Sequence, residues 1–374
     1  MRRELAERLL TNLMEWSDAE KANERAILDA FANYKYDEYQ QYAPGRRFLE
    51  SLALWLEQFE TVDQRRAAYG FLRNRLVFIS DAEMTHLVEL SFPSFVRPHL
   101  MRKTAAVTGL ETYRVKEIVQ TLEYKLLLRQ TLILGLSDGA RTDRFRRANP
   151  QEISNEQIWH AYDISDDKAD DMLEELVEDL TGLLGRAPST DESRFKTVVL
   201  LDDFTASGTS YLREDDSKPG EWKGKIAKII KKLDAGDGIG GVIANSDVKI
   251  IVVIYVASTQ AVDHIEKRLS HLPYSKGDIE FQVVHKLDAS IQLDEIQDQS
   301  IFELLENDDY FDETANDKHG AVGGASVKYG YANCRLPIIL SHNTPNNSIF
   351  LLWAEDSQSV QGLFPRVSRH RKFE

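Results

Sequence analysis

The chain has 374 residues, of which 42% are apolar and 29% charged, and its formal net charge is −15. This acidic excess argues against an extended nucleic-acid-binding surface, while the apolar fraction is sufficient for a packed core. The single cysteine, Cys334, excludes an internal disulfide and a cysteine metal cluster. No apolar run approaches the roughly 20 residues that span a membrane. Residues 1–10 are charged and do not resemble a signal peptide, so we expect a cytoplasmic protein.

Residues 1–126 have the apolar periodicity of helices. Ser17 and Glu20 have the spacing of a capping box at the start of one of these helices. The indole of Trp55 lies on an apolar stripe, which favours a place in the core. We find no catalytic constellation in this segment. The sequence therefore predicts a helical N-terminal domain over residues 1–126 and an α/β domain over residues 127–374.

The α/β part is predicted to begin with a short apolar strand at residues 131–136. A polar loop follows at once and carries Ser137, Asp138, Gly139 and Arg141. Gly139 would let the backbone approach an anion closely, and the guanidinium of Arg141 would supply a bidentate donor. The loop is either an anion site or a plain strand-to-helix turn with a surface arginine.

Charged clusters occur at three places. Residues 166–179 are strongly acidic and are predicted to be a solvated helix face. Residues 141–147 and 366–372 are basic. Each basic cluster could contact a phosphate or a nucleic-acid partner, or could be an ordinary solvated or ion-paired surface.

The most informative stretch is residues 196–213, KTVVLLDDFTASGTSYLR. Four consecutive apolar residues bounded by polar ones are typical of a buried strand in a mostly parallel sheet. Asp202 and Asp203 follow at the expected carboxyl end of this strand, where ligands of open α/β sheets usually bind. The loop after the acids is built of small and hydroxylated residues, namely Thr205, Ala206, Ser207, Gly208, Thr209 and Ser210.

A sugar phosphate would use both halves of this stretch. The backbone N–H groups and short hydroxyls of the loop can converge on a terminal phosphate. Asp202 and Asp203 can accept hydrogen bonds from ribose hydroxyls, directly or through a hydrated Mg²⁺ that they would ligate. The alternative is a strand followed by an N-capping aspartate and an ordinary turn.

An insertion follows the motif where a helix would normally start. Residues 213–224, REDDSKPGEWKG, contain a proline and two glycines, and a helical pattern resumes only at residues 225–233. The insertion could act as a lid over the site or be an ordinary surface loop. A further buried strand is predicted at residues 249–256, and the alternating pattern of residues 279–287 predicts another strand.

The C-terminal part combines loops and short apolar runs. Residues 308–328 are expected to be loop-rich, and residues 336–340 are expected to form a strand. The segment SHNTPNN at residues 341–347 follows. Its histidine and asparagines could read a base edge or a ribose, or could satisfy a turn through side-chain-to-backbone bonds.

The order of four apolar residues, two acids and a Ser/Thr/Gly loop resembles the PRPP-binding motif of type I phosphoribosyltransferases, where PRPP is phosphoribosyl pyrophosphate. The resemblance implies that residues 205–210 bind the 5′-phosphate and that Asp202 and Asp203 hold the ribose. It also implies that residues 137–141 hold the leaving pyrophosphate. Ala206 stands where the purine-salvage branch has a third acidic residue, so the loop looks closer to that of the orotate branch.

Three segments narrow the resemblance: DGAR at residues 138–141, LLDDFTASGTS at residues 200–210, and the block HNTPNN…LLW…LFPR at residues 342–366. Together they look like the phosphoribosyltransferase-like proteins of bacterial conflict systems, over roughly residues 130–370. This resemblance implies a mostly parallel sheet flanked by helices, Mg²⁺ as cofactor, and an effector role in anti-phage defence of retron type.

The resemblance leaves two functions open, while the presence of both Asp202 and Asp203 disfavours a third, a scaffold whose motif is a relic. One is a transferase that acts at the anomeric carbon of PRPP or a related ribose phosphate. The other is a nucleotide or ribose-phosphate sensor without turnover, which the alanine at position 206 keeps open. The partners implied are the ribose-phosphate or nucleotide ligand and a protein or ribonucleoprotein, such as a reverse transcriptase with its nucleic acid. No membrane partner is expected, and an oligomer is compatible with either function.

Overall fold

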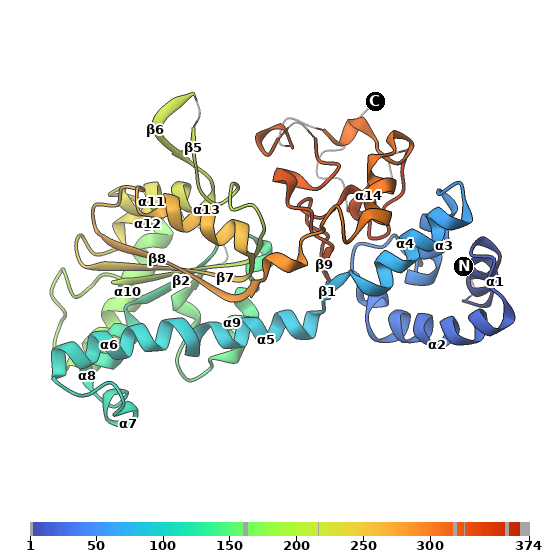
Figure 1. Cartoon of the computed structure of the whole chain (residues 1–374). Helices are drawn as coiled ribbons and strands as arrows, with labels where there is room; N and C mark the ends of the chain where they lie inside the picture. Colours follow the sequence, from blue (N-terminus) through green and yellow to red (C-terminus); the bar gives the residue numbers. More distant parts are fainter. Residues whose placement is uncertain are drawn as a thin grey trace. The chain divides into compact units, whose positions relative to one another are not determined.

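The computed structural model describes residues 3–159, 164–215, 217–316, 320–324, 326–355 and 359–366. The contacts divide the chain into two compact units, Met1–Glu83 with Asp288–Glu374, and Met84–Leu287 (Figure 1). This division does not coincide with the domain boundary expected near residue 126. Within the described part of the chain, no helix has both the length and the apolar character needed to cross a membrane.

The unit Met84–Leu287 is built on a five-stranded sheet in the order β3-β2-β4-β7-β8, and every neighbouring pair is parallel. The strands are β2 (Thr131–Gly135), β3 (Ile158–Trp159), β4 (Thr197–Thr205), β7 (Val248–Ser258) and β8 (Gly277–Leu287). The strands predicted at 131–136, 249–256 and 279–287 are therefore confirmed. β4 continues past its four apolar residues, because β7 pairs with it as far as Thr205.

Helices pack against both faces of this sheet, as the fold class predicted from the sequence requires. The helices of this unit are α6 (Arg97–Thr108), α8 (Leu122–Arg129), α9 (Thr142–Ala148), α10 (Asp166–Leu184), α11 (Lys225–Asp234), α12 (Gly238–Gly241) and α13 (Thr259–Leu269), together with the short α7 (Val115–Ile118), which contacts α6. Alternate residues of β2, β4 and β7, such as Leu134, Leu200 and Val252, form one hydrophobic cluster with α10, α11 and α13. The period of two in the strands directs the intervening residues to the opposite face, where the π-helical turn Phe92–Val96 contacts β7. Figure 1 shows α11 and α13 on one side of the sheet and α6 on the other.

The insertion after the motif is a β-hairpin formed by the antiparallel strands β5 (Arg213–Asp215) and β6 (Lys218–Lys223). It projects from the sheet unit (Figure 1). α11 begins directly after the hairpin and confirms the helix predicted at residues 225–233. The residues predicted to be a lid or a surface loop thus form a hairpin whose two strands pair with each other.

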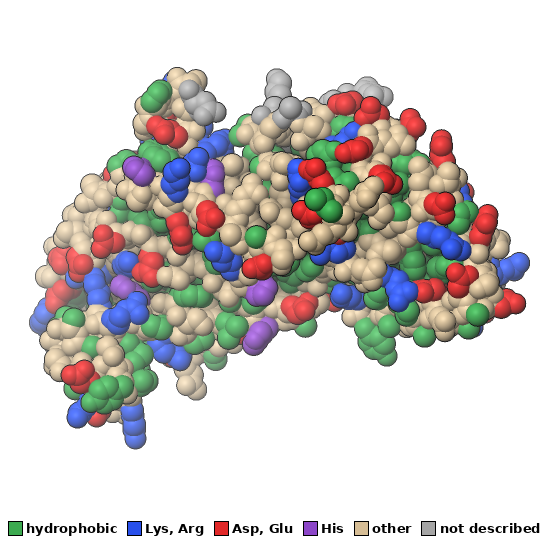
Figure 2. Space-filling model, in the orientation of Figure 1, with side chains coloured by type: hydrophobic (Ala, Val, Ile, Leu, Met, Phe, Trp, Pro, Cys, Tyr) green, Lys and Arg blue, Asp and Glu red, His purple; other side chains and the backbone are tan. Residues whose placement is uncertain are grey.

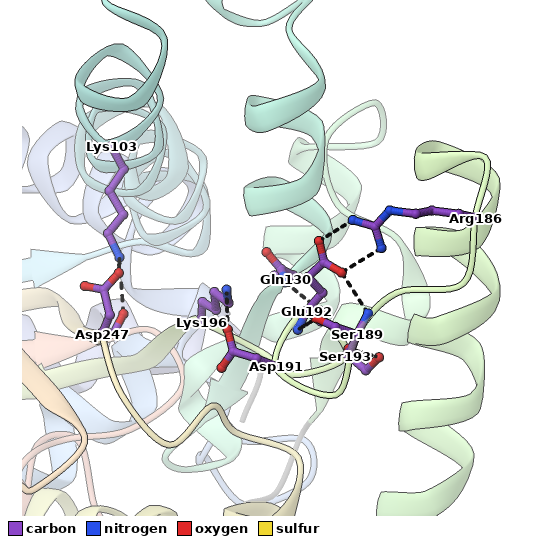
Figure 3. A network of polar contacts seen from close by, with 9 residues as sticks. All are labelled: Lys103, Gln130, Arg186, Ser189, Asp191, Glu192, Ser193, Lys196 and Asp247. Atoms are coloured by element: carbon purple, nitrogen blue, oxygen red, sulfur yellow. Dashed lines mark hydrogen bonds and ion pairs between the residues drawn. The ribbon is translucent and has the colours of Figure 1, made fainter.

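The polar segment before β4 is fixed at the amino edge of the sheet (Figure 3). Gln130 donates its side-chain N–H to the carbonyl of Glu192 at 2.7 Å, and the Glu192 carboxylate receives both Arg186 and the Ser189 backbone N–H. The carbonyl of Gln130 accepts the backbone N–H groups of Lys196 and Thr197. These bonds set the register in which β4 enters the sheet beside β2.

The unit Met1–Glu83 with Asp288–Glu374 is mainly helical. Its helices are α1 (Arg3–Leu13), α2 (Asp18–Tyr34), α3 (Phe48–Glu57), α4 (Val62–Asn74), α14 (Gln299–Glu306) and α15 (Phe350–Trp353), and α5 (Asp81–Ser91) begins in it. The predicted capping box of Ser17 and Glu20 is present at the start of α2. Trp55 is fully buried, as predicted, and its indole N–H donates to the carbonyl of Leu351 at 2.8 Å.

Pairing between distant segments explains why this unit differs from the expected N-terminal domain. β1 (Val77–Ile79) forms a parallel pair with β9 (Ile338–Leu340). Phe48, Trp55 and Phe364 belong to one hydrophobic cluster, so the C-terminal segment completes the core of the N-terminal helices. Helical periodicity shows which face of a helix is buried but not which partner covers it.

The C-terminal block HNTPNN lies in this same unit and satisfies turns and buried contacts. Tyr39 shares a hydrogen bond of 2.9 Å with the hydroxyl of Thr344. Asn347 donates to the carbonyl of Tyr331, and Ser348 donates to that of Ile338. These contacts run to other segments of the unit and bury Thr344 and Ser348, and they do not decide between the two predictions made for the histidine and asparagines of the block.

Candidate functional site

The two polar loops singled out in the sequence meet at the carboxyl edge of the sheet. β2 and β4 are parallel neighbours with Gly135 opposite Leu201, so the segments that follow them emerge side by side. Ser137 donates a hydrogen bond to the carboxylate of Asp202. A Cβ added to Gly139 would lie 2.5 Å from the carboxyl carbon of Asp203. Gly139 therefore leaves the space that the Asp203 carboxyl group occupies, so the two loops meet through this side chain and the backbone of Gly139.

Asp202 is fully buried, and both oxygens of its carboxylate accept hydrogen bonds from donors of the chain. One oxygen accepts the Ser137 hydroxyl and the backbone N–H of Asp203 at 3.1 Å. The other accepts the Tyr211 hydroxyl at 2.5 Å and the Lys225 ammonium at 2.5 Å. A carboxylate has about four acceptor positions, so this set uses all of them.

The charge of Asp202 is subject to opposing effects. Burial, and next the neighbouring charge of Asp203, raise the pKa of Asp202 above its usual value. The ammonium of Lys225 and the hydroxyl of Ser137 act in the opposite direction. The side chain of Asp202 is 0% exposed, whereas that of Lys225 is 32% exposed, so the pair connects the interior of the sheet with its surface.

Asp203 has a different environment from Asp202 although the two are adjacent. It is half-buried, and one of its carboxylate oxygens accepts the backbone N–H of Phe204 at 2.8 Å. Its carboxyl group lies over the backbone of Gly139, on the side of the β2 loop. Of the two acids, Asp203 is the one whose side chain reaches the accessible edge of the sheet.

The loop 205–210 is held against the first turn of α13. Ser258 donates its hydroxyl to the carbonyl of Ala206 and accepts the backbone N–H of Ala261 at 3.1 Å. Gly208 has φ of +75°, and a Cβ there would lie 2.9 Å from the ring of His264. Only a glycine therefore fits this turn without displacing the helix.

The loop residues differ in exposure. Thr205, Ala206 and Ser207 are buried, with at most 4% of each exposed. Thr209 is half-buried and Ser210 is exposed, and the hydroxyls of Ser207 and Thr209 lie 2.9 Å apart. The part of the loop that a ligand meets first in this conformation is thus its second half, while the first half is interior.

A tyrosine of β7 holds the loop after β2 through a hydrogen bond. The hydroxyl of Tyr255 donates to the carbonyl of Ala140 at 2.5 Å. Tyr255 is fully buried, and burial together with the charges of Asp202 and Asp203 raises its pKa well above the usual value. Asp138 is exposed, and Arg141 is half-buried with φ of +49°, a conformation uncommon for a residue with a side chain. The predicted members Ser137, Asp138, Gly139 and Arg141 are thus brought to the same edge as the acids.

The acidic pair does not fit a magnesium ion held by both carboxylates. Mg²⁺ needs oxygen ligands with lone pairs directed at it, and the acceptor positions of Asp202 are taken by protein donors, one of them a cation. Within the described ranges, no group of three or more His, Cys, Asp or Glu side chains could hold a metal ion. Asp203 is the one acid of the pair that a hydrated cation could reach.

Sequence reasoning did not identify Tyr211, Lys225, Tyr255 or Ser258 as members of this site. Tyr211 lies within the motif stretch, but a tyrosine after a loop is an ordinary helix or turn residue by its pattern. Lys225 follows the insertion, and its approach to Asp202 depends on the path of the hairpin. Tyr255 and Ser258 come from the neighbouring strand, where their only signal is a position near its carboxyl end.

The basic cluster at residues 141–147 begins with Arg141 at this edge of the sheet and continues along α9. Arg144 and Arg147 are exposed on α9. In the second cluster only Arg366 is described, and residues 367–372 lie outside the described residues. Figure 2 shows acidic and basic side chains interspersed over one face of the molecule.

Comparison with known proteins gives one match. The model of the PRTase-CE family matches residues 52–366, a range that includes both loops, the acidic pair and the C-terminal block. No curated protein and no solved structure matches the chain. The chain therefore belongs to the PRTase-CE family and is a phosphoribosyltransferase-like protein.

Proposed function

We propose that the carboxyl edge of the five-stranded sheet binds PRPP or a related ribose phosphate. The observation that carries the proposal is the meeting of two loops from neighbouring parallel strands, with Asp203 between them and Gly139 making room for it. Loops at this position of an α/β sheet usually bind ligands, and phosphate is favoured by backbone N–H groups and short hydroxyls. Membership of a phosphoribosyltransferase-like family supports the same ligand class.

In the proposed binding mode each part of the ligand has its own partner. Thr209 and Ser210, with the backbone of residues 206–210, bind the 5′-phosphate. Asp203 accepts hydrogen bonds from the ribose hydroxyls, and the loop 137–141 with Arg141 faces the pyrophosphate. A magnesium ion, where it takes part, would be carried by the phosphates of the ligand and would meet only Asp203 of the acidic pair.

The proposed reaction is transfer or cleavage at the anomeric carbon. The bond from C1 to the pyrophosphate oxygen breaks with its electron pair leaving on pyrophosphate, and a lone pair of the acceptor forms the new bond to C1. A positively charged, oxocarbenium-like transition state needs a held ribose and a neutralised leaving group. The role proposed for Arg141 meets the second need.

The second candidate is a binding module that senses the same ligand without turnover. Ala206 favours it, because this alanine, 1% exposed, stands where the purine-salvage branch has a third acidic residue. The sequestration of Asp202 favours it as well, since one carboxylate of the pair is unavailable to the ligand.

Calorimetric titration of the wild-type chain with ribose 5-phosphate and with PRPP tests the proposal. We expect saturable binding of both compounds and none of ribose, because the phosphate supplies the charge that the loop recognises. Release of pyrophosphate from PRPP would identify an enzyme, and binding without release would identify a sensor. A folded chain that binds neither phosphate compound would overturn the proposal.

We also propose an effector role in bacterial anti-phage defence, together with a protein or ribonucleoprotein partner. The support is the resemblance of three segments to phosphoribosyltransferase-like proteins of bacterial conflict systems. Induced expression of the chain alone is expected to arrest growth of a bacterial host, and the Asp203→Asn variant is expected to be tolerated. Equal growth with both chains at equal expression would contradict the role of a toxic effector.

A further inference from the structure

The ammonium of Lys225 forms an ion pair with Asp202, the buried acid of the motif. Its Nζ is 2.5 Å from a carboxylate oxygen of Asp202 and 4.8 Å from the centre of the Tyr211 ring. A fully buried carboxylate is strongly disfavoured unless a positive charge and hydrogen bonds compensate for its lost solvation. Lys225 supplies that charge from within the chain.

The backbone around Lys225 is tied to the end of the phosphate loop. The N–H of Lys225 donates to the carbonyl of Ser210 at 3.0 Å, and the N–H of Ile226 donates to that of Tyr211 at 2.9 Å. Arg213, at the start of the hairpin, donates to the carbonyl of Thr209 at 3.0 Å. The first turn of α11 therefore holds the loop through its backbone and the first acid through its side chain.

We propose that Lys225 is the built-in counter-ion of Asp202, in the place of a divalent cation held by both acids. Lys225 is then a positioning residue that couples the phosphate loop to β4, and Asp203 is the only acid of the pair that faces the ligand. The consequence for ligand binding rests on the proposed function, whereas the pairing of Lys225 with Asp202 does not.

The first test measures thermal unfolding without ligand and without metal. Lys225→Met keeps the length of the side chain and removes its charge, and we expect the midpoint to fall by roughly 5–15 °C. Lys228→Met is the matched control, because Lys228 is exposed on the same helix. Its midpoint should stay within about 1 °C of wild type. Equal midpoints for both variants would overturn the proposal.

Two further measurements separate a charge pair from loss of packing. The double variant Asp202→Asn/Lys225→Met has neither charge, so its midpoint should recover at least about half of the fall seen in Lys225→Met. If Lys225→Met alone does not fold, the double variant should still fold. Mg²⁺ should raise the midpoint of Lys225→Met by about 3 °C or more, because the uncovered carboxylate can then take a cation, and that of wild type by less than about 1 °C. A double variant no more stable than Lys225→Met, or equal magnesium shifts, would contradict the assignment.

The ligand arm uses ribose 5-phosphate as the probe. Wild-type affinity should be the same within about twofold in EDTA and in Mg²⁺, because no cation is needed at Asp202. A fall of more than about tenfold in EDTA would overturn the inference while leaving the proposed ligand in place. Absence of any binding by wild type would overturn the proposed function, and the thermal measurements would still decide the role of Lys225.

Discussion

The variant Asp203→Asn is expected to lose most of its affinity for ribose 5-phosphate and to keep its fold. Hydrogen bonds to a charged group contribute roughly 1.5–3 kcal/mol, which corresponds to about a tenfold to hundredfold increase in the dissociation constant. The side chain is half-buried at the edge of the sheet, and the amide keeps one oxygen to accept the N–H of Phe204. The thermal midpoint should therefore change by less than about 2 °C.

Asp143→Asn is the matched control for this measurement. Asp143 is exposed in the first turn of α9, close enough for its charge to contribute to the raised pKa of Tyr255. Its neutralisation removes one negative charge from the same region without touching the proposed ribose contact, so the affinity should change by less than about twofold. Equal losses of affinity in both variants would show that Asp203 acts through its negative charge at a distance and not through a hydrogen bond to the ligand.

The two acids of the motif are expected to give different results, which a reading of the sequence as one acidic pair does not anticipate. Asp202 has the Lys225 ammonium and three other donors, while Asp203 faces the loop after β2. Neighbouring residues of a strand point to opposite sides. The alternation could be predicted from the sequence only if β4 were known to extend through both acids. That extension depends on pairing with β7.

The strand and the loop of the candidate site were predictable because their sequence signals are local. Four apolar residues before two acids predict a buried strand, and small hydroxylated residues after them predict a phosphate loop. The meeting of this loop with residues 137–141 follows from a parallel sheet, provided that the two strands are neighbours. The structure confirms that they are.

The contribution of Lys225 could not be predicted in the same way. Its approach to Asp202 requires the hairpin to return the chain to its starting point, where Gly224 packs on the backbone of Tyr211. A Cβ at Gly224 would lie 2.5 Å from the carbonyl carbon of Tyr211, and φ there is +108°. The glycine is visible in the sequence, but which backbone it approaches is set by the folded chain.

The division into units is a second feature beyond local signals. The helices between residues 84 and 129 have the same periodicity as those before them, so nothing in their pattern assigns them to the sheet. The pairing of β1 with β9 joins segments at opposite ends of the chain through backbone hydrogen bonds, and such bonds are available to any sequence. The family model matches from residue 52 onward, so the region shared by the family is larger than the sheet itself.

Gly208→Val is expected to remove phosphate binding and to destabilise the sheet unit. A side chain at φ of +75° costs roughly 1–2 kcal/mol, and this one would also press on the ring of His264 and on the carbonyl of Ala261, at 2.9 Å and 3.0 Å from its Cβ. Crowding of this kind costs a further 1–3 kcal/mol, approximately. Since α13 also holds the loop through Ser258, relief of the clash would displace residues 206–210 from the conformation proposed to receive the phosphate.

Gly185→Val is the control that separates the cost of the backbone conformation from the cost of crowding. Gly185 has φ of +67° at the C-terminal cap of α10, and no atom lies within 4 Å of an added Cβ. This variant should show the backbone cost alone, a fall in the thermal midpoint of roughly 2–8 °C, and should bind ribose 5-phosphate as wild type does. Gly208→Val should show a larger fall and no detectable binding by calorimetry. Retained binding in Gly208→Val would mean that the phosphate is not held by this loop, because the substitution fills the space on which the loop conformation depends.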